Sequence, residues 1–400
     1  MSRERLIQMA KESLAHNKAG TAPLTDRITT LPASNYFDRA RWEREMELIF
    51  RRIPLALALT AELREANAYK AMDVAGMPVL LSRGADGAVR AFVNMCSHRG
   101  AQLVEEGAGS ARRFTCPYHA WVYDQTGDLV GVFKQADFGE LDTSCLGLTA
   151  LPVAERAGII WVILSPHSTV DVDAFLAGYD ELLAFHRFAE AYHYGRRILH
   201  GPNWKIAFDG YVDFYHLPVL HKNTFGPDMS PDAVFHRVGP HQRVTGPRQR
   251  WDRLEHLPED EWPLEQLTSG VWSIFPHGSI AGFEVAGRRI YQIARLFPGP
   301  TPETSITHLD FVSLTPPDDE FTALVEKQIE FLVHVVQDED YATGLKIQKT
   351  LATGTRPELF FGRNEGGAQY VHGWIEKILE TSDDQLNALF TSGFDPTRAS

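Results

Sequence analysis

This sequence contains few cysteines, and its basic residues are outnumbered by its acidic residues. Three cysteines among 400 residues are too few for a disulfide framework, which favours a reducing compartment such as the cytoplasm. The 39 lysines and arginines are outnumbered by 52 aspartates and glutamates, giving a formal net charge of −13. Nucleic-acid binding needs a basic face, so this balance argues against that class of function.

Long apolar runs and phosphate-binding glycine motifs are also missing. No apolar run approaches the ~18 residues of a membrane span. The first six residues carry charges of both signs, which predicts an amphipathic helix and not a signal peptide. Gly107-Ala108-Gly109 lacks the strand and helix that flank a nucleotide-binding turn, so neither a flavin nor a nicotinamide site is indicated.

Two short segments, C-S-H at 96–98 and C-P-Y-H at 116–119, each combine one thiol with one imidazole. A Rieske [2Fe-2S] cluster needs two cysteines on one iron and two histidines on the other. Structural zinc is an alternative, but zinc sites usually group like ligands as C-x₂₋₄-C and H-x₃₋₅-H. A catalytic Cys–His pair would leave the second pair unexplained, and unrelated buried residues are the remaining alternative. We therefore predict a cluster held by Cys96, His98, Cys116 and His119.

A second pair of histidines, His216 and His221, lies downstream. Five helical steps of ~100° turn the second side chain ~140° away from the first, so an unbroken helix cannot aim both at one metal. Pro218 lies between them and would disrupt a helix, so we expect the helix to break there. Asp213, three residues before His216, would share its helical face.

The segments C-x-H-R-G at 96–100 and C-x-x-H-x-W-x-Y-D at 116–124 resemble the Rieske domain of the Rieske non-haem iron oxygenases, in the large (alpha) subunit of the aromatic-ring-hydroxylating type. Residues 213–216, Asp-Phe-Tyr-His, resemble that family's D/E-x-Y-H motif. The resemblance implies that His216 and His221 bind a mononuclear Fe(II). It also implies that Asp213 is an electron relay between subunits, accepting N–H bonds from His216 and from His98 or His119 of another chain.

The third iron ligand is expected to be a carboxylate, because a 2-His-1-carboxylate set binds Fe(II) and leaves positions open for O₂. The family's Glu-Asp pair, followed eight residues later by Gln, resembles Glu339-Asp340 and Gln348. We choose Asp340, with Asp338 as the main alternative. Without the resemblance, this acidic run would equally suit the solvated face of a helix.

The predicted fold class is α+β, with a small all-β Rieske domain and a catalytic domain of antiparallel sheet surrounded by helices. We place an N-terminal helical segment at 1–53, packing with the catalytic domain, the Rieske domain at 54–165 and the catalytic domain at 166–400. Strands are expected at Val271–Phe275, Arg289–Phe297 and Thr304–Leu314, and helices at Asp319–Ala352 and Gln369–Thr381.

The resemblance implies a terminal oxygenase that uses O₂ and electrons from a ferredoxin and/or flavin reductase, with NAD(P)H acting only through that separate reductase. We expect hydroxylation of a hydrophobic aromatic or polycyclic substrate, with a steroid as one example. Apolar and aromatic side chains are the candidate pocket: Phe208, Phe214, Leu217, Val219, Phe225, Val271, Trp272, Phe275, Phe283, Tyr291, Ile293 and Phe331.

Three other functions stay open. One is a monooxygenase or demethylase acting on a small N- or O-methylated or carboxylated substrate. A remote alternative is an electron-transfer Rieske protein without oxygenase activity, and another is a hydrolase with a mononuclear metal at the same residues. The family implies a homo-oligomer, expected to be a head-to-tail trimer, and leaves open whether a small beta subunit joins it.

Overall fold

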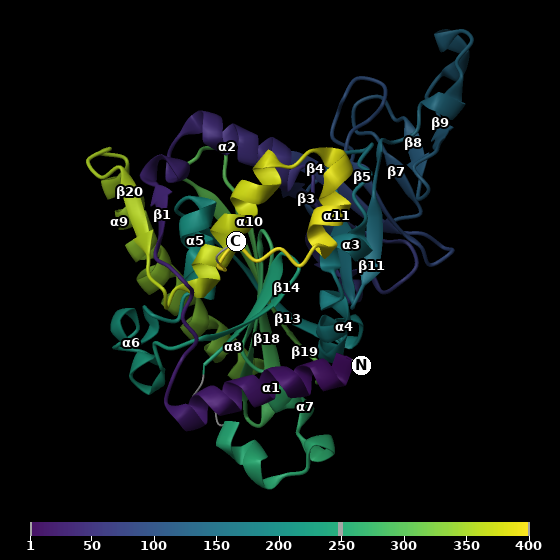
Figure 1. The fold of residues 1–400 in the computed structure, drawn as a ribbon. Coiled ribbons are helices and arrows are strands. Elements are labelled where there is room, and N and C mark those ends of the chain that lie inside the picture. Colours follow the sequence, from purple (N-terminus) through teal and green to yellow (C-terminus); the bar gives the residue numbers. More distant parts are fainter. Residues whose placement is uncertain (1, 247–250, 399–400) are drawn as a thin grey trace.

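A seven-stranded antiparallel sheet forms the centre of the molecule in this computed structural model, which describes residues 2–246 and 251–398 (Figure 1). In spatial order its strands are β13 (Tyr192–Gly201), β19 (Ser305–Ser313), β18 (Arg288–Pro298), β17 (Gly278–Val285), β16 (Val271–Ile274), β15 (His241–Thr245) and β14 (Val234–Val238). β18 is buried on both of its faces beyond its first two residues, because other elements cover both sides of the sheet.

Helices surround this sheet. Helix α5 packs on β16, β18 and β19, while α8 packs on β13 and β17, and the first helix contacts β14. Their bounds are α1 (Ser2–Ala19), α2 (Arg39–Glu45), α3 (Val172–Leu176), α4 (Tyr179–Leu183), α5 (Trp204–Val212), α6 (Leu217–Leu220), α7 (Leu264–Leu267), α8 (Asp319–His334), α9 (Ala342–Leu351), α10 (Gly366–Glu380) and α11 (Leu386–Thr391). A π-helix at Val335–Tyr341 joins α8 to α9 within the predicted long helical region, and another at Met46–Phe50 follows α2.

Short strands build the rest of the molecule, with the Rieske segment at one side of the sheet (Figure 1). A five-stranded sheet contains β10 (Ala150–Leu151), β5 (Val89–Val93), β4 (Met77–Arg83), β3 (Ala68–Val74) and β6 (Gly107–Ser110). Two three-stranded sheets contain β7 (Arg113–Thr115), β8 (Val122–Asp124) and β9 (Leu129–Gly131), and β11 (Val153–Arg156), β12 (Ile159–Val162) and β2 (Leu55–Leu59). The strand β1 (Thr29–Pro32) pairs with β20 (Glu358–Phe361).

The two largest of the four hydrophobic clusters among the described residues organise these sheets. The smaller core includes Cys96, Cys116 and Trp121 and lies under the Rieske loops. The larger core joins β2 and β12 to the seven-stranded sheet and its helices, so the two parts of the chain are packed together. The predicted α+β fold is confirmed, and no helix among the described residues is long and apolar enough to cross a membrane.

A buried network of charges also connects the Rieske strands to the central sheet. Glu62 lies 2.6 Å from Lys70 Nζ of β3 and 3.1 Å from Arg295 Nη2 of β18. Arg295 in turn pairs with Asp310 of β19 at 2.7 Å, and Arg196 of β13 contacts both carboxylates. Each charge has an opposite partner, which is the condition for keeping charged groups inside a protein.

Candidate metal centres and active site

The two Rieske loops meet at one end of the small core. Cys96 and His98 follow β5, and Cys116 and His119 lie between β7 and β8. Both cysteines are buried and unpaired, and the two imidazole rings are half-buried with their centroids 4.7 Å apart. Trp121 stacks on the ring of His98 at 4.7 Å with an interplanar angle of 7°, so this indole covers one side of the loops.

Tyr123 is a further member of this site that the sequence did not single out. Its hydroxyl lies 3.2 Å from Cys96 Sγ and accepts a hydrogen bond from the Ser97 amide at 3.0 Å. Burial raises the pKa of Tyr123 to about 12, so the phenol stays protonated and can donate to the sulfur. Hydrogen bonds to ligand sulfurs tune the reduction potential of iron–sulfur clusters. The only signal was its place in the C-x-x-H-x-W-x-Y-D segment.

The loop residues fit a two-iron cluster better than a single zinc ion. Nδ1 of His98 and of His119 is buried and has no partner among the described residues, which leaves each ring nitrogen available as a ligand. No three of the four thiol and imidazole groups bring their ligand atoms within 4.8 Å of one another. One tetrahedral ion would draw all four together, whereas a two-iron cluster is held from its two ends.

The downstream histidines are positioned by a helix that ends earlier than predicted. Helix α5 stops at Val212, and Asp213 is extended with φ −102° and ψ 120°. His216 immediately precedes the short helix α6, and His221 immediately follows it. Pro218 lies in the first turn of α6, where a proline is tolerated because no N–H is needed there. The break predicted at Pro218 is therefore wrong in place, because the helix ends at Val212, before His216.

This turn brings both imidazoles to one carboxylate. Asp340 Oδ1 lies 3.5 Å from His216 Nε2 and 3.3 Å from His221 Nε2. Among the residues that the structure describes, this is the only set of three or more such side chains whose ligand atoms all lie within 4.8 Å. Asp338 is exposed and pairs with His334 at 2.8 Å, so it lies outside the set.

Each imidazole is held from behind by a second carboxylate. Asp213 Oδ2 lies 3.1 Å from His216 Nδ1, and Glu339 Oε2 lies 2.6 Å from His221 Nδ1 and accepts from Thr224 Oγ1 at 3.0 Å. Such partners fix the tautomer and aim Nε2 at the metal. The role of Glu339 was missed, although its place in the Glu-Asp pair was visible in the sequence.

The electrostatics of this set favour a bound cation. Burial lowers the pKa of His216, but hydrogen bonds to Asp213 and Asp340 outweigh burial and raise that pKa to about 9. Burial raises the pKa of Asp340, and its hydrogen bonds to the two imidazoles bring that pKa below its ordinary value. Two imidazoles and one carboxylate with open positions suit Fe(II), so the donor set fits the metal that the family implies.

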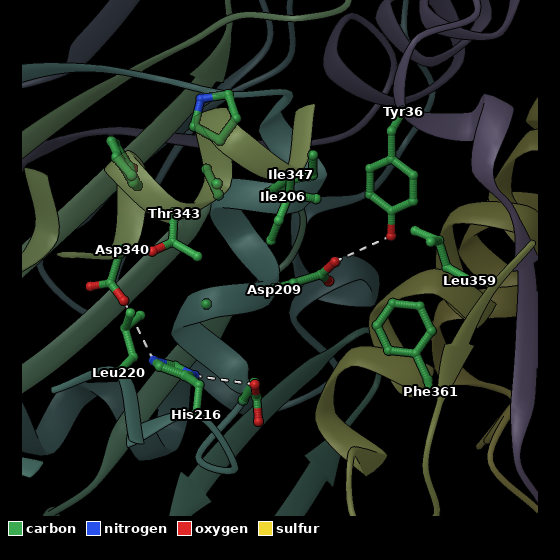
Figure 2. Close-up of a pocket in the computed structure, with 16 residues that line it drawn as sticks. Tyr36, Ile206, Asp209, His216, Leu220, Asp340, Thr343, Ile347, Leu359 and Phe361 are labelled. Carbon is green, nitrogen blue, oxygen red and sulfur yellow. Dashed lines mark hydrogen bonds and ion pairs between the residues drawn. The ribbon is translucent and has the colours of Figure 1, made fainter. Parts of the chain in front are cut away.

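His216, His221 and Asp340, called here the triad, all line one cavity of about 210 Å³, the triad cavity. Its other lining residues are Gly210, Tyr211, Asp213, Phe214, Leu217, Phe225, Met229, Gly270, Val271, Ser279, Ala281, Gly282, Phe283, Gln292, Leu332, Val335 and Val336. Figure 2 shows a second cavity, of about 250 Å³, on which His216 and Asp340 also border. There Asp209 accepts a hydrogen bond from Tyr36 at 3.3 Å and lies 3.0 Å from His372 Nε2.

The predicted pocket residues divide into those that line the triad cavity and those that do not, and for the strand residues the alternation of side chains explains the division. Phe214, Leu217, Phe225, Val271 and Phe283 line it as expected. Five other predicted pocket residues do not line this cavity and lie in the large hydrophobic core: Phe208, Trp272, Phe275, Tyr291 and Ile293. Successive residues of a strand point to opposite faces, so Val271 and Gln292 face the cavity while their neighbours Trp272 and Tyr291 face away. Val219 and Phe331 are exposed at the surface.

Two protein families match the chain. The Rieske [2Fe-2S] domain family matches residues 54–143, and the family described as ring hydroxylating alpha subunit (catalytic domain) matches residues 184–381. Together they imply a Rieske cluster and a mononuclear iron, with O₂ as co-substrate.

Curated relatives include oxygenase components with different substrates. The chain is 31% identical to the carnitine monooxygenase oxygenase subunit of Escherichia coli K12, over 52% of this chain and 56% of that protein. It is 30% identical to the chloroplastic choline monooxygenase of Beta vulgaris, over 57% of this chain and 54% of that protein. It is 31% identical to the anthranilate 1,2-dioxygenase large subunit of Acinetobacter baylyi, over 50% of this chain and 44% of that protein. The matched part is about half the length of these relatives.

Solved structures resemble the whole chain more completely. A quaternary ammonium Rieske monooxygenase in complex with L-carnitine superimposes with a TM-score of 0.73 at 22% identity, covering 90% of this chain and 96% of that chain. Naphthalene 1,2-dioxygenase from a Rhodococcus species, bound to indole, gives a TM-score of 0.73 at 21% identity, covering 96% and 100%. At sequence identities of 21–22%, this likeness shows only that the chain has the same fold as these proteins.

Proposed function

Because this chain belongs to the Rieske non-haem iron oxygenases as a large (alpha) oxygenase subunit, we propose that it oxidises a small N-methylated, cationic substrate with O₂. The observation that carries this proposal is the triad cavity, where the three ligands meet apolar and aromatic side chains in about 210 Å³. An engineered cavity of about 150 Å³ holds one benzene molecule, so this space suits a compact molecule and not a four-ring steroid.

The lining chemistry supports a cation over an aromatic acid. Phe214, Phe225 and Phe283 border the cavity, and aromatic faces attract quaternary ammonium groups. No lysine or arginine is among the described lining residues, whereas Asp213 and Asp340 are, so the charged side chains of this cavity favour a cationic group on the substrate. Relatives that act on carnitine and choline point the same way, and we propose this class in place of the aromatic or polycyclic substrates expected from the sequence.

Seven residues would hold the two metal centres. We assign the cluster to Cys96, His98, Cys116 and His119, and the mononuclear iron to His216, His221 and Asp340. With iron bound, the site would supply the activation of O₂, by which one oxygen atom enters a substrate C–H bond and the other is reduced to water with two electrons and two protons. Asp213 and Glu339 keep the two Nδ1 atoms occupied, so that Nε2 stays free for the metal. The apolar wall excludes water and orients the methyl group.

Electrons are proposed to come from a ferredoxin and/or a flavin reductase, and to pass between subunits by way of Asp213. The Rieske loops and α6 lie on opposite sides of one chain in Figure 1, which supports transfer to a neighbour's iron. A head-to-tail ring, proposed as a trimer, would bring the two together. We propose the cytoplasm as the compartment, because the ligand thiols must stay unpaired.

A substrate panel tests this proposal. Protein reconstituted with cluster and iron would be given a surrogate reductase, O₂ and, separately, choline, glycine betaine, carnitine, anthranilate and naphthalene. We expect O₂ consumption coupled to an oxidised product, identified by mass spectrometry, for at least one trimethylammonium compound. Coupled turnover of the aromatic compounds alone would contradict the substrate class and would favour a ring dioxygenase.

A further inference from the structure

One polar side chain in the triad cavity makes no hydrogen bond. Gln292 of β18 is 6% exposed and lines the cavity, and its amide has no partner among the residues that the structure describes. Two other buried glutamines have partners at both ends of the amide or at several carbonyl groups: Gln348 bonds the backbones of Asn203 and Tyr36, and Gln369 donates to three carbonyl groups. Gln242 has an Oε1 without a partner, as Gln292 does, but its Nε2 donates to a backbone carbonyl. A buried amide without a partner costs stability, so its presence at this wall calls for another explanation.

The sheet places Gln292 next to a second polar group. Gln292 is paired with Ala281 of β17, and Ser279 lies two residues from Ala281 on the same face. Ser279 is 3% exposed and lines the same cavity. The other described lining side chains with hydrogen-bonding groups are the triad, Asp213 and Tyr211. The Tyr211 hydroxyl lies 3.5 Å from that of Tyr341. The sheet wall is therefore apolar except at Gln292 and Ser279.

We propose that Gln292, assisted by Ser279, binds an oxygen-bearing group of the substrate, a hydroxyl or a carboxylate, while the methyl group to be oxidised lies at the triad. This inference rests on the proposed function, which it makes more specific. An amide can accept from a hydroxyl or donate to a carboxylate. A site built to hydrogen-bond such a group rejects an analogue that lacks it, because the amide is then left without a partner.

Matched ligand pairs test the role of Gln292 by calorimetric binding to the full, metal-loaded chain. Choline is compared with propyltrimethylammonium, which has the same charge and shape and lacks only the oxygen. Glycine betaine is compared with isobutyltrimethylammonium, which has a similar shape and lacks both the oxygens and the negative charge. We expect the oxygen-bearing member of one pair to bind about ten- to a hundredfold more tightly. Gln292→Met should bring that ratio close to one, and Ser279→Ala should reduce it.

Gln242→Met is the matched control. Gln242 is a fully buried glutamine of β15 that does not line the triad cavity. Its Oε1 has no partner among the described residues, but its Nε2 donates to Gly367 O at 3.0 Å. Its replacement should lower the melting temperature of the ligand-free protein and leave the binding ratio unchanged. Gln292→Met should melt at the temperature of the wild type or above it, because an amide without partners is replaced by an apolar chain of similar length.

The outcomes separate this inference from the proposed function. A third pair, benzyl alcohol and ethylbenzene, extends the test to aromatic ligands. If only that pair shows the preference and loses it in Gln292→Met, the cationic substrate is wrong and the role of Gln292 stands. If no pair discriminates in the wild type, or if Gln292→Met keeps the ratio or melts below the wild type as Gln242→Met does, the inference is overturned.

Discussion

At the scale of the residue, the three neighbouring acids 338–340 have three different positions. Asp340 faces both imidazoles, Glu339 supports one of them from behind, and Asp338 points to the surface. Because only Asp340 can contact a metal between the histidines, the three side chains should differ sharply in their effect on iron binding.

We expect Asp340→Ala to lose the mononuclear iron and to keep the visible absorption of the Rieske cluster. Glu339→Gln should weaken iron binding about 10- to 100-fold, the usual effect of removing a group that orients a ligand. Asp338→Asn is the control and should bind iron as the wild type does. Metal analysis with absorption spectroscopy measures all three, and full iron content in Asp340→Ala would remove this residue from the site.

Single residues were predicted from the sequence only where their chemistry is distinctive. The four Rieske residues and His216, His221 and Asp340 could be proposed because thiols, imidazoles and a carboxylate at these spacings have few other uses. Trp272 and Tyr291 were included among the pocket candidates because they are aromatic, while the strand register that turns them away from the triad cavity was not known.

At the scale of the element, the π-helix at Val335–Tyr341 sets the direction of the acidic side chains. A π-turn holds one residue more than an α-turn and is found frequently at functional sites. It lies between α8 and α9, so the residues that follow are rotated relative to an unbroken α-helix. The sequence predicted a helix over this region, but hydrophobic spacing does not show where a π-turn is inserted.

Deleting Gln337, an exposed residue within the π-helix, should restore α-helical winding. Glu339 and Asp340 lie inside the widened turn, so its loss should displace both carboxylates from the histidines. We expect a folded protein with unchanged helix content, a normal Rieske cluster and no mononuclear iron. Circular dichroism and metal analysis report these properties separately. Gln337→Ala keeps the chain length and should bind iron normally, and equal iron content in the deletion variant would show that the π-turn is dispensable.

At the scale of the whole molecule, the charge network around Glu62 joins the Rieske strands to the central sheet. Burial raises the pKa of Glu62, but Lys70, Arg295 and Arg196 outweigh burial and lower that pKa to about 2. A carboxyl whose pKa is lower in the folded state stabilises the protein above its unfolded pKa, near 4.5. That stability is lost as the pH falls from there toward 2.

Glu62→Gln should lower the free energy of unfolding by about 3–5 kcal/mol near neutral pH, because buried cations lose a partner. The variant should also lose less stability than the wild type between pH 4.5 and 2. Urea unfolding at several pH values measures both effects. Glu190→Gln, which removes the exposed partner of Arg187, is the control and should unfold like the wild type.

Electron transfer between subunits predicts complementation. Cys116→Ser lacks the cluster and Asp340→Ala lacks the mononuclear iron, so each homogeneous assembly should be inactive. Mixed assemblies, isolated with two affinity tags after co-expression, should regain substrate oxidation because an intact cluster faces an intact triad across an interface. Inactive mixed assemblies alongside an active wild type would place the transfer within one chain.

The central claim, that electrons held at the Rieske residues are used to oxidise substrate at the triad, is tested most directly by a single turnover. Protein with a chemically reduced cluster and bound substrate is mixed with O₂ without any reductase, and cluster absorption and product are followed together. We predict that the cluster is reoxidised as product forms in the wild type, and that Asp340→Ala yields no product. Product formation with the cluster still reduced, or an equal yield from Asp340→Ala, would contradict the account.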